Sequence, residues 1–172
     1  YRNPGEGVGD WSRHLVHDNV DNESPWFVDI DADGLEDLVC HSKGRLCWLE
    51  RDSSDPAARW IRHDLSEDLG LQKFTHGLGV GDVDGDGRLD VLLNQGWWRQ
   101  PESLDGDPLW SHQPVRFSPG YGGAQILVDD LDGDGDGDVI SSHAAHGYGL
   151  SWWEQVAGAD GEAEFVQHPI MG

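Results

Sequence analysis

Short hydrophobic runs alternate with turns rich in Asp and Gly along this chain. Three of these runs come directly after aspartate-rich segments: Leu38–Cys40, Val91–Leu93 and Val139–Ile140. Apolar and β-branched residues in runs this short, bounded by turn residues, are typical of β-strands. No stretch of 12 or more residues has the i, i+3, i+4 spacing of an amphipathic helix. The pattern therefore predicts an all-β protein.

The same order of elements occurs three times. The aspartate-rich segments begin at Asp29, Asp82 and Asp130, so the period is about 50 residues. Each follows an apolar run and precedes a β run, an aromatic run and a run led by Trp or Phe. The aromatic runs are Cys47–Glu50, Trp97–Gln100 and Trp152–Gln155. Four short strands per repeat at this period predict the blades of a β-propeller.

We expect three blades, over residues 21–68, 69–118 and 119–172. Trp11–Val16 repeats the pattern of Trp60–Leu65 without an aspartate segment before it, so residues 1–20 are expected to hold the outer strand of a preceding blade. Propellers typically close with four or more blades. The chain is therefore expected to be part of a larger propeller, completed by the remaining blades of a parent chain or by another copy.

Each aspartate-rich segment has Asp at positions 1, 3, 5 and 9 of a nine-residue loop and Gly at position 6. Four carboxylates held so close repel one another unless a cation neutralises them. Ca²⁺ takes six to eight oxygen ligands, so we expect one structural Ca²⁺ in each loop. The expected ligands are Asp29, Asp31, Asp33, Asp37, Asp82, Asp84, Asp86, Asp90, Asp130, Asp132, Asp134 and Asp138.

An EF-hand and a solvated acidic turn are two other interpretations of these loops. An EF-hand loop also begins with Asp at positions 1, 3 and 5 and Gly at 6, but it needs Glu at position 12 between two helices. Position 12 is Cys40, Leu93 or Ser141 here, and the flanking residues are of β type, which excludes an EF-hand. A solvated acidic turn without a metal is the remaining alternative.

The composition restricts the partners of this chain. Its 33 acidic and 11 basic residues give a formal net charge of −22, which disfavours binding to nucleic acids and to anionic membranes. Nine Trp residues argue against a disordered acidic chain. No apolar run is long enough for a membrane helix, so no membrane insertion is expected. Without an initiator Met or a signal segment, a mature domain or a fragment is expected.

The second loop and the residues before it, Val80–Asp90, resemble the calcium loop of the FG-GAP or VCBS repeat. The runs Gly96–Trp98 and Gly149–Glu154 are similar to a bacterial branch of this family with seven-bladed propellers. The resemblance implies the propeller fold, a Ca²⁺ in each loop, and a secreted, periplasmic or cell-surface location. It implies no single activity, because such propellers serve as adhesion modules, lectin-like modules and sugar-lyase scaffolds.

Several histidines and tyrosines are predicted to lie on the propeller face opposite the aspartate loops. These residues are His76, His143, His146, His41 and Tyr148, with Tyr121 at the entry to the third blade. Neutral imidazoles there can bind a transition metal such as Zn²⁺, or abstract a proton from a sugar substrate. The alternative is a set of polar loop residues on a wet surface.

The remaining aromatic and sulfur residues are expected to be structural. His14, His63 and His168 recur in the outer strands, whereas His112 is offset by one residue. The Trp pairs are expected to pack between blades, although an exposed member can stack on a sugar ring. Cys40 and Cys47 are expected to lie opposite each other in a hairpin centred on Lys43-Gly44, as a disulfide or as two free thiols.

Two functional hypotheses follow. The first is a calcium-binding propeller scaffold that binds a carbohydrate or protein ligand. The second is a carbohydrate lyase or dehydratase that uses the histidine-lined face.

Overall fold

The computed structural model describes residues 1–7, 9–119, 122–158 and 162–172. These residues form three four-stranded antiparallel sheets, each ordered as its strands follow in the chain. Blade 1 contains β1 (Trp26–Val28), β2 (Asp37–Ser42), β3 (Arg45–Glu50) and β4 (Ile61–Asp64). Blade 2 contains β5 (Gly79–Gly81), β6 (Asp90–Leu93), β7 (Gly96–Arg99) and β8 (Ser111–Gln113). Blade 3 contains β9 (Ile126–Asp129), β10 (Asp138–Ser142), β11 (Leu150–Ala157) and β12 (Ala163–Met171).

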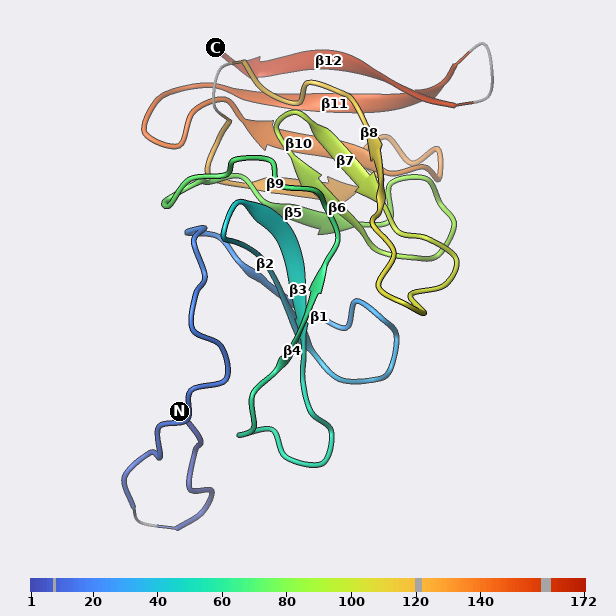
Figure 1. Ribbon diagram of the computed structural model, residues 1–172. Coiled ribbons are helices and arrows are strands. Elements are labelled where there is room, and N and C mark those ends of the chain that lie inside the picture. The colour runs from blue at the N-terminus through green and yellow to red at the C-terminus, as the bar shows by residue number, and fades with distance from the viewer. Residues whose placement is uncertain (8, 120–121, 159–161) are drawn as a thin grey trace.

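The three sheets are stacked in chain order, with blade 1 at the bottom and blade 3 at the top of Figure 1. The all-β class and the blade-like four-stranded sheets predicted from the repeat are therefore confirmed. The stack is open, so the larger seven-bladed ring stays a prediction. No helix that is long and apolar enough to span a membrane occurs in the described part of the chain.

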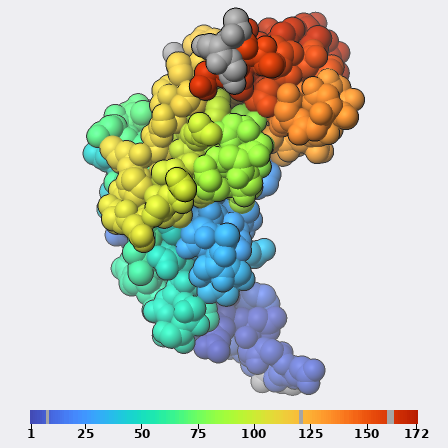
Figure 2. Space-filling model, turned by 90° about the vertical axis from the view of Figure 1, so that its right-hand side faces the viewer, coloured from blue at the N-terminus to red at the C-terminus, as the bar shows by residue number. Residues whose placement is uncertain are grey.

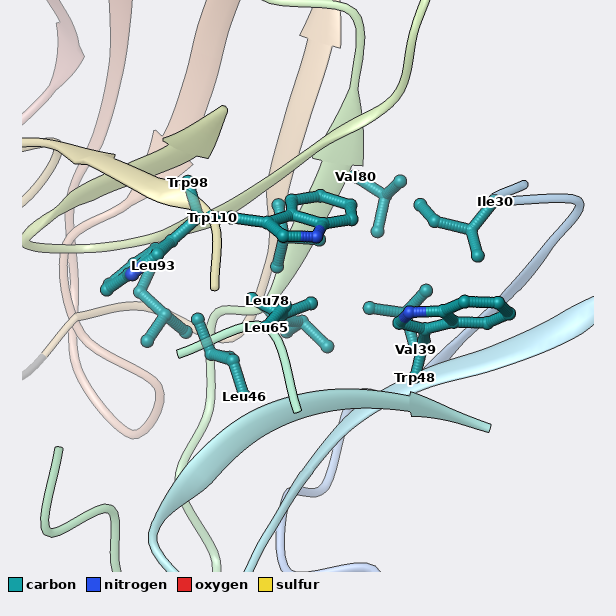
Figure 3. Close-up of a cluster of buried hydrophobic side chains, with 11 residues drawn as sticks. Ile30, Val39, Leu46, Trp48, Leu65, Leu78, Val80, Leu93, Trp98 and Trp110 are labelled. Carbon is teal, nitrogen blue, oxygen red and sulfur yellow. The ribbon is translucent and has the colours of Figure 1, made fainter. Parts of the chain in front are cut away.

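The two larger hydrophobic cores lie between neighbouring blades. Because side chains alternate along a strand, each inner strand has one face for each neighbour. The first cluster contains Val39 and Trp48 of blade 1 and Leu93 and Trp98 of blade 2, with Leu65 and Leu78 between the two pairs (Figure 3). The second cluster fills the junction between blades 2 and 3 and includes Trp97. Trp97, Trp98 and Trp153 thus pack between blades as expected, whereas Trp152 is in neither cluster.

Two glycines let the inner strands of blades 2 and 3 approach closely. A Cβ atom placed on Gly81 of β5 would lie 2.5 Å from the Cβ of Val128 on β9. A Cβ on Gly79 would lie 2.9 Å from the carbonyl oxygen of Ile126. Neither position has room for a side chain, which sets the spacing of this junction.

The strand register corrects one detail of the repeat alignment. Trp48 is paired with Val39, Trp97 with Leu92, and Trp152 with Ile140, at equivalent positions of the three sheets. Trp48 therefore corresponds to Trp97. The sequence alignment of Cys47–Glu50 with Trp97–Gln100 matches Trp48 to Trp98, so it is shifted by one residue. The turn between the second and third strands differs in length among the blades, and only backbone pairing reveals the shift.

Residues 11–16 differ from the predicted outer strand. They form no strand, and Arg2 and Ser12 make an isolated bridge. Even so, the Trp60 N–H donates to the Val16 carbonyl at 3.0 Å, as the Trp110 N–H donates to the Leu65 carbonyl at 2.9 Å. The segment thus has the contact of an outer strand with the next blade. It lacks a third strand beside it among the described residues, so no ladder forms.

Candidate metal centres

Three aspartate loops connect the first and second strands of the three blades. We name them loop 1 (residues 29–37), loop 2 (residues 82–90) and loop 3 (residues 130–138). All three lie on one side of the stack, at the right of Figure 1, and this side faces the viewer in Figure 2. The repeat therefore places its three acidic clusters along one face of the molecule.

The carboxylate oxygens of each loop converge. In each cluster, three Asp side chains offer oxygen atoms that lie within 4.8 Å of one another. The clusters are Asp29, Asp31 and Asp33; Asp82, Asp84 and Asp86; and Asp130, Asp132 and Asp138. Within the described residues, groups with this geometry consist of aspartates alone. Such a set of hard oxygen donors is suited to Ca²⁺ or Mg²⁺ and poorly suited to softer metals.

The carboxylate of the Asp at position 1 accepts hydrogen bonds from backbone N–H groups of its own loop. In loop 2, Asp82 Oδ1 accepts a hydrogen bond from the Gly85 N–H and Oδ2 accepts one from the Gly87 N–H, both at 2.9 Å. Gly85 and Gly87 have φ of 72° and 85°, in the left-handed region that favours glycine. Loop 1 has Ala32 at the position of Gly85, with a φ of 60°, and it adopts the same turn.

The Asp at position 9 of each loop, which we call the ninth Asp, connects the loop to its blade through hydrogen bonds. These residues are Asp37, Asp90 and Asp138. Asp90 is fully buried, and its two oxygens accept hydrogen bonds from the N–H groups of Val83 (3.0 Å) and Gln100 (2.9 Å). Equivalent bonds join Asp138 to Leu131 and Gln155, and Asp37 to Arg51. Each of these aspartates therefore connects its loop or second strand to the end of the third strand.

Burial changes the titration of two of these carboxyls in the metal-free chain. Desolvation raises the pKa of Asp90 to about 7, although two backbone N–H groups oppose this shift. Desolvation likewise raises the pKa of Asp37 to about 6. A carboxylate is costly to bury without a cation, so both sites gain from a positive ion nearby.

Several buried loop oxygens are available to bind a cation. Asp29 Oδ1, Asp37 Oδ2 and Asp136 Oδ1 are buried and have no hydrogen-bond partner. Buried carboxylate oxygens are normally paired, since leaving them unpaired costs free energy. The donor set and these unpaired oxygens therefore fit the Ca²⁺ sites expected from the sequence.

Two arginines beside loop 2 were not identified from the sequence. Arg99 of β7 lies with its Nε 2.5 Å from Asp84 Oδ2, and Arg88 within the loop forms an ion pair with Asp86. The positions of Arg88 and Arg99 in the sequence could have indicated both ion pairs. Arg88 is the only basic residue inside an aspartate loop, and Arg99 follows the Trp pair where the other blades have Glu50 and Glu154.

A cleft of about 400 Å³ opens beside loop 1, between blades 1 and 2. Within it, the ring of His63 stacks on Trp48, with centroids 4.2 Å apart. His63 Nε2 lies 3.0 Å from Glu50 Oε2, and Nδ1 lies 2.5 Å from Asp107 Oδ1 on the facing blade. This histidine therefore links two blades, which agrees with its expected structural role.

The outer-strand histidines fall into two groups. Blade 3 repeats the arrangement of His63, since His168 stacks on Trp152 and contacts Glu154 Oε2 at 2.6 Å. His112 stacks on Trp98 instead, and Trp98 packs toward blade 1. The offset of His112 in the sequence thus places it on the other face of its sheet.

A cleft of about 380 Å³ occupies the equivalent place between blades 2 and 3. It is lined by Asp84 and Arg99 from blade 2 and by Asp136 and Gln155 from the side of blade 3. Gln155 is buried, and its Oε1 has no hydrogen-bond partner. The two clefts share their position in the repeat but differ in charge, since Arg99 replaces the Glu50 of the first cleft.

Two of the candidate histidines meet on the other side of the stack. The rings of His76 and His146 make an edge-to-face contact with centroids 5.1 Å apart, and His76 Nδ1 lies 3.3 Å from Glu23 Oε2. Tyr148 is exposed in the same long loop, between β10 and β11, which lies opposite the aspartate loops in Figure 1. His76, His146 and Glu23 thus form a polar cluster on this side.

The other candidates do not join this cluster. His143 Nε2 is hydrogen-bonded to Ser151 Oγ at 2.7 Å. His41 is fully buried, neither of its ring nitrogens has a partner, and desolvation lowers its pKa. Tyr121 lies outside the described residues. The sequence thus placed six candidates on one face, whereas the geometry brings His76 and His146 together with Glu23.

Comparison with known proteins supports the repeat. Residues 29–93 match the FG-GAP-like repeat family, a span that contains loops 1 and 2 and the strands between them. No curated protein and no solved structure matches the chain significantly. The match confirms the resemblance to the FG-GAP or VCBS repeat.

Proposed function

Since residues 29–93 belong to the FG-GAP-like repeat family, we propose that this chain is a calcium-stabilised propeller scaffold of a secreted or cell-surface protein. The observation that carries the proposal is the convergence of three carboxylates in each of three loops. The charge of −22 supports it, because bound divalent cations offset the repulsion between these acids.

In this proposal the loop carboxylates hold the ion. The Asp at position 9 joins the ordered loop to the blade, so that ion binding also stabilises the blade. Bound Ca²⁺ supplies positive charge and fixes the turn between the first and second strands. Asp82 organises the backbone of its loop through Gly85 and Gly87, so the ligands are preoriented. Asp90 then connects the loop to the end of β7. The role of the ion is structural and not catalytic.

Calcium removal tests the proposal. At a free Ca²⁺ concentration 100 times the dissociation constant, each site stabilises the folded chain by about 2.7 kcal/mol. Three such sites correspond to a decrease in Tm on the order of 20 °C after chelation, for a chain of this size. The experiment is a thermal melt with Ca²⁺, with chelator, and with Ca²⁺ restored. An unchanged Tm contradicts the proposal, and NaCl at the same ionic strength is the control.

We further propose that the scaffold binds a carbohydrate or protein ligand. The inter-blade clefts support this, because they combine carboxylates, amides and an arginine beside aromatic walls. Polar groups of this kind in a concave site are typical of ligand recognition. Binding of immobilised polysaccharides, measured with and without Ca²⁺, tests the carbohydrate case.

A second candidate function is a carbohydrate lyase or dehydratase. The contact of His76 with both His146 and Glu23 favours it, since a carboxylate-bound imidazole is suited to proton abstraction. The test is turnover of a uronate polysaccharide by the chain and by the His76→Asn variant. His14→Asn, at an exposed histidine, is the matched control. Absence of turnover by the unmodified chain contradicts this candidate.

A further inference from the structure

Cys40 and Cys47 lie directly opposite each other on adjacent strands of blade 1. They are register partners in the β2–β3 pair, and their sulfur atoms are 3.7 Å apart. Directly opposed residues of an antiparallel pair have Cα atoms about 4.5–5.5 Å apart, within the range that a disulfide spans. Small side-chain rotations are therefore enough to bring the sulfurs to bonding distance.

The hairpin that carries the two cysteines is tight. Lys43 and Gly44 both have positive φ, 53° and 85°, as a two-residue turn requires. A Cβ at position 44 would also contact the Asp68 carboxylate, which would have to move aside. The turn and the hydrophobic register together hold the cysteines in one relative position. Their effective concentration is accordingly high, which favours an intramolecular bond.

The surroundings of the sulfurs also suit a disulfide. Both cysteines are fully buried in a small apolar cluster with Leu49, Leu38 and Trp60. This cluster lies on the face of blade 1 that points away from blade 2. The cluster on the opposite face, between the two blades, is larger. A covalent bond there stabilises the blade face with the smallest hydrophobic core.

We propose that Cys40 and Cys47 form a disulfide bond that closes the β2–β3 hairpin. The oxidant is a disulfide of a thiol–disulfide exchange partner, such as oxidised glutathione. One cysteine attacks that disulfide, forms a mixed disulfide and releases one thiol. The other cysteine attacks the protein sulfur of the mixed disulfide, forms the Cys40–Cys47 bond and releases the second thiol. The two cysteine protons leave with the two released thiols.

The electrostatics favour Cys47 as the residue that attacks the oxidant first. The Cys40 thiol beside it lowers the pKa of Cys47, and the nearby positive charge of Arg62 adds to this effect. A thiolate is the attacking species in exchange. Because the folded blade buries both sulfurs, the bond forms while the hairpin is still open to the oxidant, before the apolar cluster is covered.

The inference bears on the proposed function through its compartment, since disulfides persist in oxidising environments outside the cytosol. It is tested separately from calcium binding. The unfolded, reduced chain is refolded with Ca²⁺ in a mixture of reduced and oxidised glutathione, quenched with acid, denatured and alkylated. We expect an intact mass about 2 Da lower than that of the reduced chain and no alkyl group. A sample refolded with reductant is the control and carries two alkyl groups.

Thermal melts of the same samples measure the effect of the bond. We expect the oxidised chain to melt about 5–10 °C above the reduced chain, because the bond restricts the unfolded state. The Cys40→Ala/Cys47→Ala double variant is expected to melt at the same temperature with and without reductant. Two alkylated thiols in the oxidised sample, glutathione adducts, or dimers on a non-reducing gel overturn the proposal.

Discussion

Loop 2 and loop 3 have the same aspartate spacing but balance their negative charge differently. In loop 2, Asp84 and Asp86 are only 14% and 16% exposed, and they form ion pairs with Arg99 and Arg88. In loop 3, Asp130, Asp132 and Asp134 are exposed. Among the described residues, no arginine or lysine forms an ion pair with a carboxylate of loop 3. Loop 3 also carries the additional Asp136, so its charge is both higher and unpaired.

The difference shows that one motif can be stabilised in two ways. Protein cations partly neutralise loop 2 before any metal arrives, and they compete with the metal for the same oxygens. Loop 3 has no such protein cation among the described residues. Loop 3 is therefore expected to need Ca²⁺ more, whereas the ninth Asp acts in the same way in both loops.

Substitution of the ninth Asp has the largest expected effect. Asp90→Asn leaves a backbone N–H of Val83 or Gln100 facing an amide NH₂, with both groups buried. We expect a loss of about 2–4 kcal/mol in the free energy of unfolding, with and without Ca²⁺. Asp138→Asn is expected to cost a similar amount, since it has the same two contacts. Chemical denaturation of both variants measures the loss.

The exposed Asp132 of loop 3 is the matched control for these variants. Asp132→Asn is expected to leave the metal-free chain unchanged or slightly more stable, because it removes one of several like charges. It is expected to destabilise the chain only when Ca²⁺ is present. Equal losses for Asp90→Asn and Asp132→Asn in the metal-free chain would mean that the ninth Asp has no special structural role.

The pH dependence of stability is expected to reverse when Ca²⁺ is bound. In the metal-free chain Asp90 has a pKa of about 7, above its unfolded value of about 4. The folded chain therefore holds a proton that the unfolded chain releases. This contribution to stability is complete below pH 4 and is lost as the pH rises through 7. We expect the metal-free Tm to fall from pH 5 to pH 8.

Bound Ca²⁺ requires ionised carboxylates, so the Tm of the calcium-loaded chain is expected to rise over the same range. Thermal melts in the two conditions measure both slopes. The Asp90→Asn variant is the control, because it removes the titrating group and is expected to flatten the metal-free slope. A metal-free Tm that rises from pH 5 to pH 8 would contradict the assignment.

Removal of Arg99 is expected to have the smallest effect. Arg99→Gln leaves Asp84 without its ion pair, and the partly exposed arginine contributes about 0.2–1 kcal/mol to stability. The variant is expected to bind Ca²⁺ a few-fold more tightly at loop 2, because the competing charge is gone. Calorimetric Ca²⁺ titrations of the variant and the unmodified chain measure this change. An unchanged affinity at every site would refute the competition between arginine and metal.

Much of the fold followed from the repeat. Apolar runs such as Val91–Leu93 lie in strands, and the Lys43-Gly44 turn places Cys40 opposite Cys47 as expected. The register of Trp48 was not predicted, because neighbouring Trp residues make two alignments equally attractive and only strand pairing distinguishes them. Residues 11–16 have the predicted strand pattern, but a strand also needs a partner, which a local pattern cannot supply.

The candidate site was predicted at the level of residue type. The spacing of Asp82, Asp84 and Asp86 indicated a cluster, since these positions lie in one tight turn. The two backbone contacts of Asp90 and the ion pair of Arg99 depend on the distance between the loop and β7, which is set by packing. The burial of His41 likewise follows from the tertiary structure and not from its position after a strand.

The most direct test of the account is anomalous diffraction from crystals grown with Ca²⁺, which locates each ion and counts its ligands. The account predicts one Ca²⁺ in each of loops 1, 2 and 3, with Arg88 and Arg99 moved away from loop 2. The expected ligands are Asp29, Asp31 and Asp33; Asp82, Asp84 and Asp86; and Asp130, Asp132 and Asp138. Loops without ions at saturating Ca²⁺, or ions held by residues outside these loops, would contradict it.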